Sequence, residues 1–124
     1  MKFSLETIII FVRDIERMKL FYTDIFKLEV VEEIKSEWVL LKAGSCNIGL
    51  HKIGEQYLFK EKENPKSNSN IKIVFEIYDD IYNERENLIN KDVEMREVKV
   101  FDDHFFRCDG KDPEENIFQL KQRK

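Results

Sequence analysis

The 124-residue sequence contains few of the residues that interrupt regular structure, with only four glycines and two prolines. Most of the chain should therefore form helices and strands rather than long loops. The longest apolar run, residues 7–12, is too short to cross the ~30 Å hydrocarbon core of a bilayer. It does not resemble a signal peptide, because charged residues stand on both sides of it and no small-residue cleavage site follows. We therefore expect no membrane association.

The sequence also lacks an excess of basic residues and any cysteine motif. Lys and Arg number 21 against 25 Asp and Glu, which gives a net charge of −4 at pH 7. A nucleic-acid-binding surface would need clustered Lys and Arg, so no nucleic-acid partner is predicted. Cys46 and Cys108 do not have the spacing of a metal or redox motif. They predict two reduced thiols in a cytoplasmic protein, with a disulfide between them as the alternative.

The first half of the chain has the hydrophobic pattern of a βαβββ unit. A β-branched and aromatic run over residues 7–12 predicts a buried strand, and Asp14 is suited to cap the helix predicted over residues 15–26. Three short strands are predicted next, over residues 28–34, 38–42 and 47–53.

The second half repeats this pattern. It predicts a strand over residues 71–77, a helix after Asp79 and Asp80, and further strands over residues 93–101, 104–108 and 116–121. A shift of 65 residues places Ile8 on Ile73, and a shift of 70 places Ile48 on Phe118. The chain is therefore predicted to be an internal duplication of one βαβββ module.

These patterns predict an α+β protein that forms a single domain over residues 1–124. The first module covers about residues 1–54 and the second about residues 71–124, with residues 55–70 as the connection. The connection is rich in Lys, Glu, Asn and Ser, which is typical of a solvated loop. A flap over a pocket is the alternative interpretation.

Several segments are similar to motifs of the vicinal oxygen chelate superfamily, which includes glyoxalase I, bleomycin-resistance and fosfomycin-resistance proteins, and extradiol dioxygenases. The similar segments in the first half are residues 11–14, 21–22 and 24–30, and those in the second half are residues 75–79 and 112–120. Their order and spacing cover essentially the whole chain. One departure is Glu115, which stands where the family has glycine in its closing turn, and we interpret it as relaxed turn geometry.

The resemblance implies that the mixed sheets of the two modules form a curved cup with the helices outside. Metal-dependent members of the family carry His, Gln or Glu ligands at four positions inside this cup. The corresponding positions here are Thr7, Gly49, Lys72 and Gln119. Of these, only Gln119 has a side chain suited to coordinate a divalent ion, whereas a catalytic zinc normally has about three protein ligands. The resemblance therefore implies a cup without a metal or other cofactor.

Alternation along the strands predicts which side chains line this cup. Apolar walls that carry a few polar groups are typical of small-molecule sites. The predicted ligand-binding residues are Phe11, Trp38, Gly49, His51, Lys72, Glu76, Gln119 and Lys121. No catalytic residue is assigned.

The main functional hypothesis is a metal-free, bleomycin-resistance-like protein that binds a small anionic or aromatic molecule. The alternative is a glyoxalase-like lyase or isomerase, or a dioxygenase, that depends on a divalent metal held by His51, Glu76 and Gln119. A third hypothesis is an interaction subunit with a collapsed cup. The open sheet edges and the resemblance together predict a homodimer.

Overall fold

The computed structural model describes residues 2–54, 71–101 and 104–124. The chain divides into two compact units, Met1–Pro65 and Lys66–Lys124, and each is described by itself. The segment that we predicted to be a connection or flap, residues 55–70, lies outside the described residues. Among those that are described, no helix is long and apolar enough to cross a membrane.

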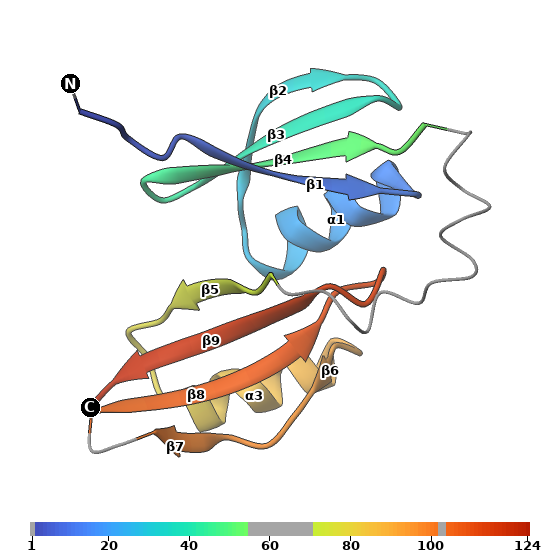
Figure 1. The fold of residues 1–124 in the computed structure, drawn as a ribbon. Helices are drawn as coiled ribbons and strands as arrows, with labels where there is room; N and C mark the ends of the chain where they lie inside the picture. The colour runs from blue at the N-terminus through green and yellow to red at the C-terminus, as the bar shows by residue number, and fades with distance from the viewer. Residues whose placement is uncertain (1, 55–70, 102–103) are drawn as a thin grey trace. The chain divides into compact units, whose positions relative to one another are not determined.

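The first unit is a four-stranded sheet with one helix against it (Figure 1). Its elements are β1 (Thr7–Val12), α1 (Ile15–Ile25), β2 (Glu29–Ile34), β3 (Trp38–Ala43) and β4 (Cys46–Lys52). The strand order is β1-β4-β3-β2. Strand β1 runs parallel to β4, and the other neighbouring pairs are antiparallel.

The second unit has the same plan, with helix α3 against a five-stranded sheet (Figure 1). Its elements are β5 (Ile73–Glu76), α3 (Ile81–Asn90), β6 (Glu94–Met95), β7 (Lys99–Phe101), β8 (Phe105–Lys111) and β9 (Ile117–Arg123). The strand order is β5-β9-β8-β6, and β7 also pairs with β8. Strand β5 is parallel to β9, like β1 and β4. The predicted α+β class with two tandem βαβββ modules is confirmed.

One predicted strand, over residues 93–101, is divided into β6 and β7. Its pairing with β8 shifts by one residue between the pair Met95–Gly110 and the pair Lys99–Arg107. Strand β2 has a similar shift against β3, between Val30 and Glu32. An extra residue of this kind bends a strand and interrupts its ladder. Both modules therefore have a bulge in the strand that follows the helix.

The aspartates that end the first strand of each module cap the helices, as their position predicts. The Asp14 carboxylate accepts a hydrogen bond from the Arg17 backbone N–H at 3.1 Å, and Asp80 accepts one from Tyr82 at 2.9 Å. Both helices are followed by a residue in left-handed conformation, Lys27 (φ 57°) and Asp92 (φ 65°). The two helices thus begin and end in the same way.

Each sheet has one face against its helix and an opposite face, which we call the open face. In β1, Val12 is fully buried, whereas Ile9 and Phe11 are about half exposed, at 49% and 54%. This alternation follows the predicted assignment of faces. The core of the first unit consists of Val12, Ile15, Met18, Tyr22, Val39, Leu41, Ile48, Leu50 and Ile53, and that of the second of Ile81, Leu88, Val93, Cys108, Phe118 and Leu120.

The turn between β8 and β9 is organised by Asp112, whose carboxylate is buried. The carboxylate accepts hydrogen bonds from the backbone N–H groups of Glu114 and Asn116, both at 2.9 Å, and from the Asn116 side chain. Glu115 in this turn has a φ of 66°. Our interpretation of relaxed turn geometry was therefore wrong, because the left-handed conformation is kept although Glu carries a Cβ. The local hydrogen bonds offset its cost of roughly 1 kcal/mol.

Candidate functional site

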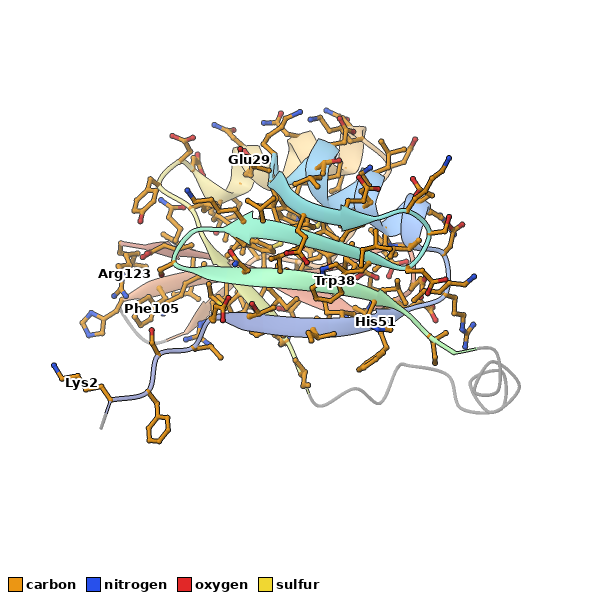
Figure 2. The ribbon with its side chains drawn as sticks, turned by 90° about the horizontal axis from the view of Figure 1, so that it is seen from above. Lys2, Glu29, Trp38, His51, Phe105 and Arg123 are labelled. Carbon is orange, nitrogen blue, oxygen red and sulfur yellow. The ribbon has the colours of Figure 1, made fainter. Side chains whose placement is uncertain are left out.

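The open face of the first unit carries an aromatic cluster on three neighbouring strands. Phe11 on β1 and His51 on β4 have ring centroids 5.4 Å apart, and Trp38 on β3 lies 6.0 Å from His51. Figure 2 shows Trp38 and His51 on these strands. Phe11 and His51 are both exposed, so the cluster is available to a planar or apolar ligand.

Gly49 explains how the Trp38 ring lies against the sheet. A Cβ at position 49 would come within 2.3 Å of the ring atom Cη2 of Trp38. Any larger residue would displace the indole ring, since real Cβ atoms do not approach carbon atoms so closely. The indole Nε1 also donates a hydrogen bond to Glu32 at 2.8 Å. Gly49 and Glu32 together fix the position of the ring.

The hydrogen bonding of His51 determines which of its ring nitrogens is exposed as an acceptor. Nδ1 lies 2.8 Å from the backbone oxygen of Lys52. A carbonyl oxygen only accepts hydrogen bonds, so Nδ1 carries the proton and Nε2 is the basic nitrogen of the neutral ring. His51 can therefore accept a hydrogen bond from a ligand.

The open face of the second unit is charged, and Asp109 on β8 lies at its centre. One carboxylate oxygen accepts a hydrogen bond from Lys72 Nζ at 2.9 Å, and the other accepts one from Gln119 Nε2 at 2.8 Å. Burial opposes the ionisation of Asp109, but these hydrogen bonds and the charge of Lys72 outweigh it and lower the pKa of Asp109. Asp109 is therefore an ionised group that only accepts hydrogen bonds.

A pocket of about 150 Å³ opens beside this network. Its lining residues are Lys72, Arg96, Glu97, Lys99, Arg107, Asp109 and Gln119. Four of the side chains are cationic and two are carboxylates, and one of these carboxylates, Asp109, is already paired with Lys72. The Glu97 side chain is 89% exposed and approaches Arg85 at 3.9 Å. The side chains that line the pocket therefore carry a net positive charge.

A second group of cations surrounds the ring of Phe105, which also lies on the open face of the second unit. Lys121 Nζ is 4.1 Å from the ring centroid, and the guanidinium carbons of Arg123 and Arg107 are 5.2 and 5.6 Å from it. Phe105 and Arg123 are labelled in Figure 2. Cations at these distances are attracted to the electron-rich face of the ring. The aromatic ring thus helps to hold several positive charges on one surface.

The structure brings the predicted ligand-binding residues together in part. Phe11, Trp38, Gly49 and His51 form one cluster in the first unit, and Lys72 and Gln119 are joined through Asp109 in the second. Glu76 and Lys121 are neighbours in the β5–β9 register, but they have different partners. Glu76 accepts a hydrogen bond from Arg123 at 2.8 Å, and Lys121 lies over Phe105. Whether these residues bind a ligand remains a prediction.

Sequence reasoning missed five residues of the pocket, Arg96, Glu97, Lys99, Arg107 and Asp109. The alternation of Phe105, Arg107 and Asp109 along β8 was a usable signal, because it places all three on one face. We had ended that predicted strand at Cys108, which left Asp109 outside it. Arg96 lies where the register shifts between β6 and β7, a position that simple alternation does not describe.

The residues at the metal-ligand positions of the family do not fit a divalent ion. Gly49 has no side chain and the Trp38 ring fills the space beside it, while Lys72 brings an ammonium group. Gln119 directs its amide nitrogen to Asp109, and Glu76, from the alternative set, is engaged by Arg123. Within the described ranges, no group of three or more His, Cys, Asp and Glu residues could hold a metal ion.

Comparisons with known proteins support the fold. No protein-family model matches the sequence, and no curated protein sequence matches it significantly. Among solved structures, the chain is similar to TnmS3, an antibiotic binding protein from Streptomyces sp. CB03234, with a TM-score of 0.75 and 15% identity over 99% of this chain and 98% of that one. The chain is also similar to lactoylglutathione lyase from Agrobacterium tumefaciens, with a TM-score of 0.73 and 14% identity over 96% of this chain and 92% of that one. For the fosfomycin resistance protein FosX from Listeria monocytogenes, the TM-score is 0.73 and the identity is 17% over 98% of this chain and 93% of that one.

These neighbours share the fold of the vicinal oxygen chelate superfamily, and the chain has that fold. The resemblance seen in the sequence is therefore confirmed at the level of the fold. The neighbours include an enzyme and an antibiotic-binding protein, so the fold does not specify the activity. The function has to be argued from the residues of the two open faces.

Proposed function

We propose that the protein binds a small anionic molecule in the pocket of the second unit, without a catalytic metal. The excess of cationic side chains in a pocket of about 150 Å³ is the observation that carries this proposal. Arg96 and Arg107 each offer a planar set of N–H donors that matches a carboxylate or a phosphate group. The similarity to an antibiotic binding protein is consistent with a binding function.

The aromatic cluster of the first unit supports the aromatic part of the original hypothesis. Phe11, Trp38 and His51 provide ring faces and edges, and His51 Nε2 provides a hydrogen-bond acceptor. We propose that this surface binds apolar or aromatic groups, because such rings gain free energy when a planar group covers them. The two open faces thus differ in the chemistry that they offer.

Binding of phenylacetate and phenyl phosphate, measured by isothermal titration calorimetry, tests the anion site. Arg107→Met should weaken the binding of both anions by about tenfold, because the substitution removes one charged hydrogen-bonding group from the pocket. Lys91→Met is the matched control, since Lys91 is exposed at the end of α3 and does not line the pocket. Failure of both anions to bind, or equal losses in the two variants, would contradict the proposal.

Elemental analysis of protein purified without chelator tests the metal-free part of the proposal. A stoichiometric content of nickel, zinc, manganese or iron that is lost in His51→Ala or Gln119→Ala would support the metal-dependent lyase or dioxygenase instead. We expect no stoichiometric metal, because the ammonium group of Lys72 and the ring of Trp38 occupy the positions described above.

We also propose that the protein is a homodimer. In the sheets that the described residues form, β1 and β2 of the first unit pair on one side only, as do β5, β6 and β7 of the second. Unpaired strand edges are usually covered in native proteins. Light scattering at working concentration should give twice the mass of the 15.0 kDa chain, and a monomeric mass would refute the proposal.

A further inference from the structure

Gln119 is the uncharged member of the described residues that line the basic pocket. Its side chain lies on the open face of β9, between Asp109 on β8 and Val74 on β5 in the sheet register. It is only 6% exposed, so its amide group has few alternative positions. A buried amide that borders a pocket is well placed to recognise a ligand.

Asp109 determines how this amide is oriented. Both carboxylate oxygens accept hydrogen bonds, one from Gln119 Nε2 and the other from Lys72 Nζ. If the amide turned over, its oxygen would face an ionised carboxylate oxygen, and two acceptors would repel each other. The amide oxygen Oε1 is therefore directed away from Asp109, and it has no hydrogen-bond partner among the described residues.

We infer, building on the proposed anion site, that Gln119 makes the pocket selective for anions that carry a hydroxyl or N–H donor beside the charged group. A 2-hydroxycarboxylate is the simplest member of this class. The carboxylate would interact with the arginine and lysine side chains while the hydroxyl donates to Gln119 Oε1. Asp109 acts as a positioning residue, because it holds the amide in the orientation that presents this acceptor.

The selectivity follows from the cost of a buried acceptor without a donor. An anion that lacks the hydroxyl covers Gln119 Oε1 and removes its water without replacing the hydrogen bond. Sites built to accept from a substrate hydroxyl discriminate against analogues that lack it for this reason. A net hydrogen-bond contribution of ordinary size corresponds to a preference of about fivefold.

Mandelate and phenylacetate are a suitable pair of probes, because they differ by one hydroxyl and are both ionised at pH 7. Isothermal titration calorimetry should show that the protein binds mandelate about fivefold more tightly than phenylacetate. Lactate and propionate form a smaller pair with the same difference and should show the same preference.

Two variants separate recognition from a merely structural effect. Gln119→Leu removes the acceptor, so the preference for mandelate should disappear. Phenylacetate should bind at least as tightly as it does to the unchanged protein, because it no longer covers an oxygen that lacks a donor. Asp109→Asn keeps the shape but removes a negative charge and adds donors that let the Gln119 amide turn over. Both acids should then bind about threefold more tightly, while the preference for mandelate falls. General damage to the pocket would weaken both acids instead.

The outcomes distinguish the inference from the proposal on which it rests. If both acids bind equally well and respond to Arg107→Met, the anion site stands and the selectivity is refuted. If mandelate is preferred but Gln119→Leu keeps the preference, another group accepts the hydroxyl and the role of Gln119 is refuted. If neither acid binds, the anion site itself is refuted and the inference falls with it.

Discussion

The two units have the same strand order and the same parallel pairing, but their open faces differ in chemistry. Positions that occupy the same place in the two registers are Phe11 and Glu76, Trp38 and Arg107, Leu40 and Asp109, Gly49 and Gln119, and His51 and Lys121. At these places the first unit has apolar, aromatic or small residues together with one histidine, and the second has charged residues and one amide. One framework thus presents two chemically different surfaces.

The helix-facing positions do not differ in this way. Ile48 corresponds to Phe118 and Leu50 to Leu120, and all four are buried. These side chains must leave water for the module to fold, so only apolar residues suit them. The open faces are free of this requirement, and their residues can differ without loss of the framework.

The largest change in the free energy of unfolding is expected at the turn between β8 and β9, which distinguishes the second unit from the first. Asp112→Ala should lower the free energy of unfolding by about 3 kcal/mol, because it leaves the N–H groups of Glu114 and Asn116 without their acceptor. The corresponding turn of the first unit has Gly44 and Ser45, and Ser45 is exposed. Ser45→Ala should therefore change stability by less than about 0.5 kcal/mol. Urea unfolding measures both, and similar losses in the two variants would contradict this account.

Gly49→Ala should disrupt the aromatic face of the first unit. The new Cβ would clash with the Trp38 ring, so we expect the free energy of unfolding to fall by about 2 kcal/mol. Trp38 is the sole tryptophan of the chain, so its fluorescence spectrum should change as well. In a Trp38→Ala background the same substitution should cost less than about 0.5 kcal/mol. An equal cost in both backgrounds would show that the ring is not the cause.

A smaller change in stability should distinguish the residues that follow the C-terminal ends of α1 and α3. Lys27 and Asp92 both have the left-handed conformation, which is unfavourable for residues with a Cβ but less so for Asp. Lys27→Gly should raise the free energy of unfolding by about 0.7 kcal/mol, and Asp92→Gly by about half as much. Thermal or urea unfolding compares the two variants. A larger gain at Asp92 would mean that its side chain does not favour this conformation.

A similarly small effect on stability concerns the Lys72–Asp109 pair on the open face of the second unit. Because the pKa of Asp109 is lowered on folding, the pair stabilises the protein above the ordinary value of 3.8, and this contribution is lost as pH falls through the lowered pKa. At pH 7, Lys72→Met should cost about 0.5 kcal/mol, since both groups are partly exposed. The difference between variant and unchanged protein should shrink as the pH is lowered from 7 to 2, because protonation of Asp109 removes its charge. A constant difference between pH 7 and pH 2 would show that the ion pair is not responsible.

Much of the fold was predictable because it depends on local patterns. The β-branched and aromatic run over residues 7–12 correctly indicated a strand, and the aspartates before each helix correctly indicated the helices. The period of two along a strand then gave the faces. The division of residues 93–101 into β6 and β7 was not predictable, because a bulge depends on the pairing with β8 and leaves little trace in composition. The predicted domain boundaries and ligand-binding residues remain predictions.

The sequence by itself determined the two βαβββ modules, since strand and helix periodicity and the capping aspartates act over a few neighbouring residues. It also determined which strand faces are apolar. Only the tertiary structure decided that Asp109 joins Lys72 to Gln119, and that Trp38 lies over Gly49. These contacts join residues on different strands, and their existence depends on strand order and register. The chemistry of the two open faces therefore follows from pairing between distant segments rather than from any local motif.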